Sequence, residues 1–289
     1  MRLPEHLKTK ICPTDDLVNK KVRKILSAMG LNTVCDKARC PNKTSCYCSG
    51  TATFLIMGKI CTRNCRFCNI EKACPEPLDP NEPKNLAVAV KELGLKYCVI
   101  TSVTRDDLPD FGANHFAATI REVRVLCPDT KIEVLTPDFC GSKSALDTVI
   151  AAKPDVFNHN IETVKSMYKK AREMADYEQS LGVLRHAANS GIITKTGIMV
   201  GLGETVIELE ELFEDIARTG CKILTIGQYI QPSKKHLPVE KYYKPEEFRL
   251  LGEMSQKVGM AQVVSAPLAR SSFKAHDSYN EASRHLRQV

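Results

Sequence analysis

Three cysteines in one short segment have the spacing of an iron–sulfur cluster site. They are Cys61, Cys65 and Cys68, and their spacing is C-x3-C-x2-C. Three thiolates on one loop can bind three corners of a [4Fe–4S] cube, which leaves the fourth iron without a protein ligand. An open iron can bind a small chelating molecule, such as the amino and carboxylate groups of a methionine moiety. The alternatives are ordinary core thiols and a zinc site, which usually takes four ligands.

A second set of three cysteines lies upstream, with the spacing C-x4-C-x5-C. It consists of Cys35, Cys40 and Cys46. Neither gap places two thiols on one face of a helix, so we expect residues 32–50 to form a loop that folds around whatever it binds. Three interpretations stay open: a second cluster, three unrelated cysteines, or a zinc site completed by a distant histidine or by Cys48.

Composition narrows the class of protein. The chain has 289 residues, 13 cysteines, and a net charge of +7 from 41 basic and 34 acidic residues. An odd number of thiols, concentrated between residues 35 and 74, indicates metal binding rather than a disulfide scaffold. Because the basic residues are scattered, we expect no nucleic-acid surface. No apolar run is long enough to span a membrane, and residues 1–13 lack a signal-peptide core. We therefore expect a cytoplasmic protein with no membrane partner.

The segments that must position these cysteines alternate between strands and helices. We predict strands at residues 53–57, 97–102, 131–136, 156–160, 193–200 and 223–229. We predict helices at residues 15–29, 84–93, 113–125, 144–152, 177–190 and 206–219. Single helices between apolar strands imply right-handed crossovers and a parallel sheet. Six such units predict an α/β fold, a partial (βα)6 TIM-type barrel rather than a closed eight-stranded one.

This pattern divides the chain into three predicted parts. Residues 1–50 form an N-terminal extension that carries the upstream cysteine loop, residues 51–230 form the barrel, and residues 231–289 form a C-terminal extension that closes it. Barrel enzymes carry their chemistry at the carboxyl ends of the strands. The first such end, at Met57, directly precedes Cys61, so the barrel would present that cysteine loop at its active face.

The two cysteine sets also carry a family resemblance. The C-x3-C-x2-C loop, just after a first barrel strand, resembles the signature of the radical S-adenosylmethionine (SAM) superfamily. With the upstream set, the chain resembles the lipoyl synthase family over about residues 31–275. The similar segments are residues 33–35, 40–42, 46, 50–54, 101–108, 133–139, 156–163, 197–204, 228–233 and 267–273. The double cysteine motif is the most specific of them.

The resemblance implies a reaction. Such an enzyme inserts two sulfur atoms at carbons 6 and 8 of a protein-bound octanoyl-lysine, giving the lipoyl cofactor. It implies two [4Fe–4S] clusters and SAM as cosubstrate, with the sulfur coming from an auxiliary cluster. The partners would be octanoylated lipoyl carrier domains, of a 2-oxoacid dehydrogenase E2 or the glycine cleavage H protein, and a reductant such as ferredoxin or flavodoxin. A basic rim at Lys234 and Lys235 would suit an acidic carrier domain.

The resemblance also assigns site residues. Cys61, Cys65 and Cys68 would hold the SAM cluster, and Cys35, Cys40 and Cys46 the auxiliary cluster, with Ser272 as its fourth ligand and Ser271 as the alternative. Serine oxygen is a harder ligand for iron than thiolate, so that corner would be labile. The predicted SAM contacts are Phe67, Asn160, Glu162, Arg172, Gly201 and Glu204. Packing or buried hydrogen bonding is the alternative for these contacts. We expect no catalytic residue beyond the cluster ligands.

Several residues depart from the family pattern without removing a cluster ligand. They are Cys48, Phe111, Glu173, Gln179, Ala266 and Phe273. Three rival hypotheses remain. A radical SAM enzyme that inserts sulfur into a small molecule or transfer RNA is disfavoured by the upstream cysteine set. An iron–sulfur electron carrier is disfavoured by the barrel pattern, and a zinc-bound nucleic-acid module by the absence of basic patches.

Overall fold

The computed structural model describes residues 3–8, 15–37, 40 and 42–288. Within these residues the chain divides into two compact units. The first unit consists of Lys10–Arg63 and Asn69–Phe157, and the second of Met1–Thr9, Asn64–Cys68 and Asn158–Val289. The chain therefore leaves the first unit for five residues in the middle of the C-x3-C-x2-C motif.

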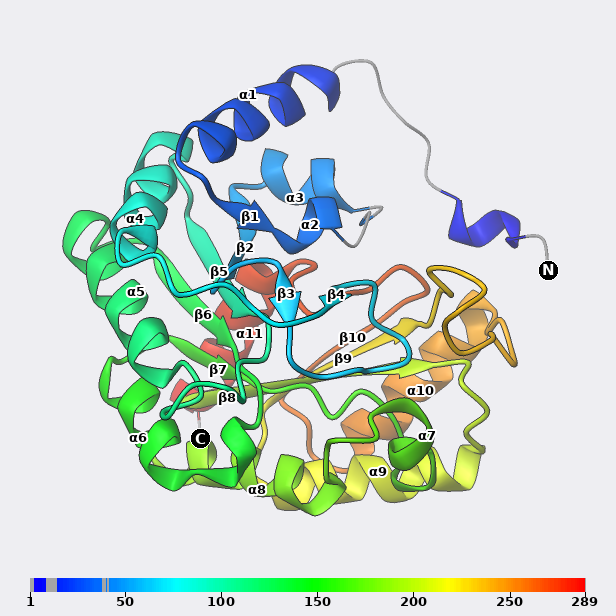
Figure 1. Ribbon diagram of the computed structural model, residues 1–289. Coiled ribbons are helices and arrows are strands. Elements are labelled where there is room, and N and C mark those ends of the chain that lie inside the picture. Colours follow the sequence, from blue (N-terminus) through cyan, green and yellow to red (C-terminus); the bar gives the residue numbers. More distant parts are fainter. Residues whose placement is uncertain (1–2, 9–14, 38–39, 41, 289) are drawn as a thin grey trace. The chain divides into compact units, whose positions relative to one another are not determined.

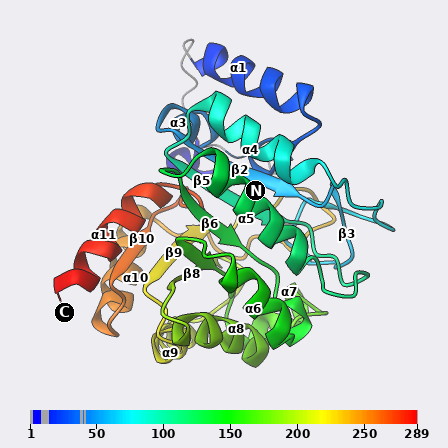
Figure 2. The same ribbon diagram turned by 90° about the vertical axis from the view of Figure 1, so that its left-hand side faces the viewer.

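The first unit is built on parallel strands with helices along one side (Figure 1). Its elements are α1 (Asp15–Ala28), β1 (Asn32–Thr33), α2 (Val34–Lys37), α3 (Lys43–Cys48), β2 (Thr51–Ile56), β3 (Ile60–Cys61), β4 (Glu71–Lys72), α4 (Glu82–Leu93), β5 (Tyr97–Ser102), α5 (Ala113–Leu126), β6 (Lys131–Leu135), η2 (Phe139–Gly141) and α6 (Lys143–Ala151). Strands β2, β5 and β6 pair in parallel, and β1 pairs antiparallel with β2. Figures 1 and 2 show α4, α5 and α6 side by side along these strands.

The chain enters the second unit at the end of β7 (Val156–Asn158). The elements of the second unit are η1 (Glu5–Leu7), η3 (Lys165–Met167), α7 (Tyr168–Ala171), α8 (Tyr177–Asn189), β8 (Ile193–Val200), α9 (Val206–Arg218), β9 (Ile223–Gln228), α10 (Pro245–Lys257), β10 (Gln262–Ser265) and α11 (Ala275–Gln288). Strands β8, β9 and β10 pair in parallel. The last helix, α11, lies beside β10 (Figure 2).

Burial and capping explain why these segments form these elements. All six residues of β2 and all six of β9 are buried, as expected for parallel strands covered on both faces. Helix α4 ends at Gly94, which adopts a left-handed φ of 61°; glycine takes this conformation without steric cost. Helix α9 begins with a capping box in which Thr205 and Glu208 satisfy each other's backbone N–H groups.

The predicted α/β repeat is confirmed. Each of the six predicted strands and six predicted helices is present, and their ends agree within about two residues. Six βα pairs follow one another along the chain, three beginning at β2, β5 and β6 and three at β7, β8 and β9. No described helix has the length and apolarity needed to cross a membrane.

The expectation that residues 32–50 form only a loop was wrong. This stretch contains β1 and the short helices α2 and α3. A six-residue helix is not stable alone, and α3 is held by contacts with α1 and β2, including a 2.8 Å hydrogen bond from the Asn19 amide to Thr44 Oγ1. These stabilising contacts are tertiary, so no local sequence pattern predicts them. The sequence prediction also did not include α7, α10, β10 and α11.

Candidate functional site

Cys61 is the last residue of β3, and its sulfur accepts hydrogen bonds from two backbone N–H groups. Its sulfur accepts the backbone N–H of Thr104 at 3.3 Å and that of Arg63 at 3.5 Å. Between them, Thr62 donates its amide and its hydroxyl to the Thr104 carbonyl at 3.1 and 3.0 Å. Two backbone N–H donors are therefore already in place around the sulfur of the first cysteine in the motif.

The rest of this cysteine loop belongs to the second unit and is anchored through its backbone. The Arg66 N–H donates to the Ala171 carbonyl at 2.9 Å, and the Arg66 carbonyl accepts the N–H of Leu237 at 3.0 Å. The Cys68 carbonyl lies 3.1 Å from Nε2 of His236. Contacts from two separate segments therefore fix the loop that carries the second and third cysteines.

Phe67 packs into an apolar cluster of the second unit. The buried members of that cluster are Ala171, Leu202, Tyr229 and Leu237. The phenylalanine ring is only half-buried, so one part of it rests on protein while the rest stays available to another flat group. This agrees equally with the packing role and with the predicted position beside an adenine.

Asn160 and Glu162 lie where the chain leaves β7 and runs beside β8. The Glu162 N–H donates to the Gly197 carbonyl at 3.0 Å, and Glu162 has a φ of 71°, which is uncommon for any residue but glycine. Its carboxylate accepts a hydrogen bond from the Asn160 amide at 3.1 Å. Burial raises the pKa of Glu162, and the charge of Arg172 acts in the opposite direction. The uncommon backbone conformation of Glu162 fixes the direction in which its side chain leaves the backbone.

The side chain of Arg172 holds the backbone of residues 160 and 161. Its Nη1 donates to the carbonyls of Asn160 and Ile161, at 3.1 and 3.4 Å, and to the hydroxyl of Tyr168 at 3.1 Å. Its guanidinium also lies over the Tyr168 ring, 5.4 Å from the ring centre. These contacts favour the alternative role for Arg172, in which the buried side chain positions Asn160 and Glu162.

The amide of Asn160 reaches the C-terminal Arg-Ser-Ser segment. Its side chain forms hydrogen bonds with the hydroxyl of Ser271. Gly197 makes room for this pair, since a Cβ there would lie 2.8 Å from Asn160 Oδ1 and 3.0 Å from Ser271 Oγ. The next residue, Ser272, is half-buried, and the described residues offer no recorded hydrogen bond to its hydroxyl. The two serines therefore differ: Ser271 is hydrogen-bonded to an amide, whereas Ser272 has no hydrogen bond from its hydroxyl within the described part of the chain.

The turn after β8 is held together by the side-chain carboxylate of Glu204. Glu204 accepts the backbone N–H groups of Gly201, Leu202 and Gly203 at 2.6, 2.9 and 3.1 Å. Gly201 and Gly203 have φ values of 103° and 116°, which glycine adopts readily. A Cβ at Gly201 would lie 2.2 Å from Nε2 of Gln228. Glu204 thus shapes the turn, and its oxygens are largely occupied by the backbone.

The upstream cysteines form an electrostatically coupled group in the first unit. Burial, then the neighbouring Cys40, raises the pKa of Cys35 to about 11. Burial, then Cys35 and Cys40, raises the pKa of Cys46 to about 12. The Cys40 N–H also donates to the Cys35 carbonyl at 3.0 Å. Neighbouring thiols of the set therefore contribute to the raised pKa values of Cys35 and Cys46, so members of the set lie near one another in the folded chain.

Cys48 differs from these three. It is exposed, and it lies two residues after Cys46 on α3, so the two side chains leave the helix in different directions. Within the described residues, no three His, Cys, Asp or Glu side chains lie close enough to share a single metal ion. A four-iron cluster does not need three side chains around one ion, because each of its thiolates binds a different iron.

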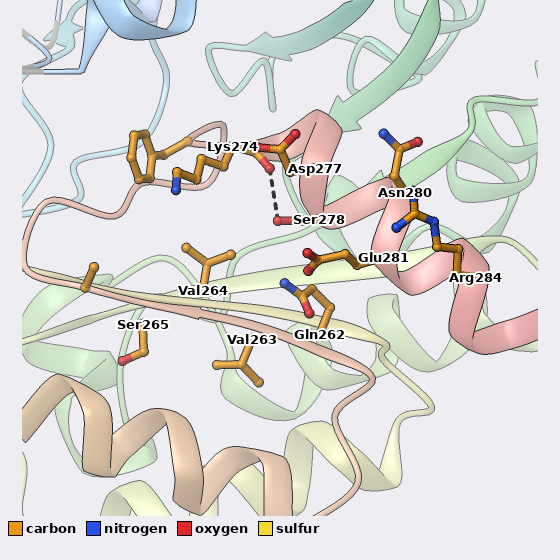
Figure 3. Close-up of a pocket in the computed structure, with 12 residues that line it drawn as sticks. Gln262, Val263, Val264, Ser265, Lys274, Asp277, Ser278, Asn280, Glu281 and Arg284 are labelled. Atoms are coloured by element: carbon orange, nitrogen blue, oxygen red, sulfur yellow. Dashed lines mark hydrogen bonds between the residues drawn. The ribbon is translucent and has the colours of Figure 1, made fainter. Parts of the chain in front are cut away.

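The second unit also has an open pocket between β10 and α11 (Figure 3). The side chains of Gln262 and Glu281 point into the same space, and Ser278 donates to the Lys274 carbonyl at 3.0 Å. None of the predicted cluster ligands or SAM contacts lines this pocket.

Comparisons with known proteins decide the family. The model of the radical SAM superfamily matches residues 55–216. Lipoyl synthase of Caldanaerobacter subterraneus subsp. tengcongensis is 50% identical over 277 residues, covering 95% of this chain and 96% of that protein. The chain belongs to the lipoyl synthase family. Lipoyl synthase of Bacteroides fragilis is 51% identical over 275 residues, covering 95% of each chain.

Solved structures agree on the fold of this lipoyl synthase family member. The crystal structure of methylornithine synthase has a TM-score of 0.56 at 14% identity, and covers 87% of this chain and 85% of that one. The crystal structure of a maturase of the [FeFe]-hydrogenase has a TM-score of 0.52 at 13% identity, and covers 96% of this chain and 65% of that one. At such low identity these likenesses concern the fold alone.

Membership of the lipoyl synthase family confirms several predictions. The resemblance, the partial-barrel fold, the assignment to the enzymes and a part in lipoate biosynthesis are all confirmed. The radical SAM family implies a [4Fe–4S] cluster and SAM as cofactors. The roles of individual residues, the division into three parts and the auxiliary cluster stay predictions.

Sequence reasoning missed one group of buried charges. Arg63 forms ion pairs with Asp106 and Asp138 in the first unit. The two aspartates lie in segments 101–108 and 133–139, which carried the family resemblance without an assigned role. A signal was present, because Arg63 stands inside the cysteine motif and both aspartates follow predicted strands.

Proposed function

We propose that this chain inserts sulfur at carbons 6 and 8 of an octanoyl group carried on a protein lysine, with the sulfur drawn from an auxiliary [4Fe–4S] cluster. The observation that carries the proposal is the second set of three thiols, Cys35, Cys40 and Cys46, separate in sequence from the C-x3-C-x2-C motif, in a chain of the lipoyl synthase family. A radical SAM enzyme needs only that motif for its first cluster, so a second group of thiols requires another purpose.

The first cluster would be held by Cys61, Cys65 and Cys68. This donor set fits, because it offers three thiols on one anchored loop and already supplies two N–H groups to the Cys61 sulfur. When bound, the cluster would supply the one electron that breaks a carbon–sulfur bond of SAM, which gives methionine and a 5′-deoxyadenosyl radical able to take a hydrogen atom from the octanoyl chain. The contribution of the chain is to hold the loop rigid, since a misplaced radical would attack nearby groups.

The auxiliary cluster would be held by Cys35, Cys40, Cys46 and Ser272. Thiols whose pKa values are raised to about 11 and 12 are protonated near neutral pH, so iron binding would displace their protons. We choose Ser272 over Ser271 because the Ser271 hydroxyl is committed to Asn160. A serine oxygen matches iron less well than a thiolate does, and a weak attachment suits a cluster that surrenders sulfur.

SAM would be held mainly by residues of the second unit. We assign Asn160 and Glu162 to its polar groups and Phe67 to its adenine. Gly201 would contribute through its backbone in the turn, since the space beside its Cα is filled by Gln228 and Lys241. Arg172 and Glu204 would act indirectly, because the first holds the Asn160–Glu162 stretch and the second holds the turn after β8.

The substrate would arrive on an octanoylated lipoyl carrier domain, and electrons would come from a reductant such as ferredoxin or flavodoxin. The net charge of +7 supports an acidic carrier, and Lys234 and Lys235 are exposed. Binding of the carrier should therefore weaken as salt is added. The expected cytoplasmic location rests on the sequence alone.

Anaerobic reconstitution tests the proposal. The wild-type chain should hold about eight irons, as two four-iron clusters, and should release 5′-deoxyadenosine when SAM and a strong reductant are added. Cys35→Ala, Cys40→Ala and Cys46→Ala should retain SAM cleavage and lose lipoyl formation, while Cys61→Ala should lose both. Cys221→Ala, which replaces a buried thiol outside both sets, is the control. Lipoyl product from the three upstream variants would refute the proposed sulfur source.

A further inference from the structure

The motif residue Arg63 is buried between two aspartates of the first unit. Its guanidinium donates from Nε and Nη2 to Asp106, at 2.6 and 3.0 Å, and from Nη1 and Nη2 to Asp138, at 2.8 and 2.7 Å. The side chain of Arg63 is 5% exposed, and that of Asp138 is fully buried. Two forked, charge-assisted pairs hold the arginine in one orientation.

The three residues come from three loops at the carboxyl ends of strands. Arg63 follows β3, Asp106 follows β5 and Asp138 follows β6. An arginine guanidinium stays protonated in proteins, so the two carboxylates always face a positive charge. The arginine therefore acts as a permanent cation that joins three loops at the face where barrel chemistry occurs.

This junction also determines the position of the backbone around Cys61. The Arg63 N–H is one of the two donors to the Cys61 sulfur, and the other comes from Thr104, two residues before Asp106. The Asp106 N–H donates to the Thr62 hydroxyl at 3.2 Å, and that hydroxyl donates to the Thr104 carbonyl at 3.0 Å. Both donors to the sulfur therefore belong to segments that the Arg63–Asp106 pair ties together.

We propose that Arg63 is a positioning residue which, through Asp106 and Asp138, fixes the two N–H···S hydrogen bonds on Cys61 and thereby sets the reduction potential of the cluster at that cysteine. This inference rests on the proposed assignment of Cys61 as a cluster ligand. Hydrogen bonds to the sulfurs are among the determinants of the potential of an iron–sulfur cluster. Donors stabilise the extra negative charge of the reduced state, so their loss makes the potential more negative.

A purely structural role is the competing explanation, since removing one partner of a buried ion pair destabilises a protein. The two roles separate if the net charge is conserved and the potential is measured. Arg63→Lys keeps the positive charge but cannot form two forked pairs. Asp106→Glu keeps the negative charge and displaces the carboxylate, at a position with 19% side-chain exposure.

The matched control is Arg124→Lys. Arg124 forms an ion pair with Asp155 in the same unit, at 2.6 Å, next to the start of β6 and β7 rather than at their carboxyl ends. It thus reports what the loss of an arginine–aspartate ion pair does when the cluster loop is not involved.

The experiment uses the reconstituted full chain. Iron content and melting temperature are measured for each variant, and the midpoint potential is taken from the electron paramagnetic resonance signal that changes when SAM is added. We expect Arg63→Lys to retain its iron and to titrate at a more negative potential than the wild type. Asp106→Glu should shift in the same direction by less, and Arg124→Lys should titrate with the wild type.

A folded Arg63→Lys chain with the wild-type potential would overturn the inference, as would an equal shift in Arg124→Lys. If Arg63→Lys gives no cooperative melt, Asp106→Glu decides alone, and a wild-type potential there has the same meaning. A wild-type chain that shows no SAM-responsive signal would refute the proposed cluster site itself, so failures of the two proposals are distinguishable.

Discussion

The hydroxyl of Ser271 and the side-chain amide of Asn160 are hydrogen-bonded in both directions. Asn160 Nδ2 lies 2.9 Å from Ser271 Oγ, and Ser271 Oγ lies 3.1 Å from Asn160 Oδ1. The same Nδ2 donates to Glu162. A residue assigned to SAM is thereby joined to the segment that carries Ser272, which is assigned to the auxiliary cluster.

The two serines should respond differently to substitution. Ser272→Ala should lower lipoyl formation by more than about tenfold while SAM cleavage continues, because a cluster ligand is lost. Ser271→Ala should lower the free energy of unfolding by about 1 kcal/mol, through loss of a hydrogen bond, and should retain the iron of both clusters. Product formation and iron content measured on both variants check this, and the reverse result would make Ser271 the ligand.

Gly197→Ala should disturb the Asn160–Ser271 pair. The new methyl group would approach both side chains to 3.0 Å or less, and overpacking of this kind costs about 1–3 kcal/mol. We expect a higher KM for SAM together with a lower melting temperature. Gly182→Ala in α8 is the control, because a Cβ there meets no atom within 4 Å and alanine favours a helix. Equal effects of the two variants would argue against a specific role for the pair.

Glu204→Gln should weaken the turn after β8. The carboxylate accepts three backbone N–H groups, and an amide has only one oxygen to offer them, so the expected loss is about 1–3 kcal/mol of stability. SAM should bind more weakly, as titration calorimetry can measure. Glu210→Gln, at an exposed position in α9, should change neither quantity. Unchanged SAM affinity in Glu204→Gln would remove the turn from the SAM site.

Cys48→Ser should leave both clusters intact. The thiol is exposed and points away from the direction of Cys46, so its replacement should keep about eight irons per chain and wild-type lipoyl formation. Cys46→Ser is the matched change on the same helix and should hold less auxiliary iron, because serine oxygen is a poorer ligand for iron than thiolate sulfur. If Cys48→Ser lost that iron as well, Cys48 would replace Ser272 as the fourth ligand.

Local pattern was sufficient for the six strands and six helices of the predicted repeat. The apolar run 97–102 forms a strand with the predicted ends, because buried parallel strands are apolar on both faces. The strand at 193–200 also has its predicted ends, although Thr194, Lys195 and Thr196 are buried polar residues. Gly94 ends α4, since a left-handed residue is easiest as glycine. The helices α2 and α3 escaped prediction because each is too short to be stable without α1 and β2.

In the candidate site too, local sequence determined some features and tertiary packing determined the others. The amino-acid sequence by itself determined two sets of three thiols, their order along the chain and the strand that precedes the first set, because ligand chemistry and spacing are local properties. Only the tertiary structure decided that Cys48 stands apart from its neighbours, that Ser271 is committed to Asn160, and that Arg63 is enclosed by Asp106 and Asp138. Each of these depends on which distant side chains fill the space around a residue, and packing, unlike spacing, is settled only when the chain has folded.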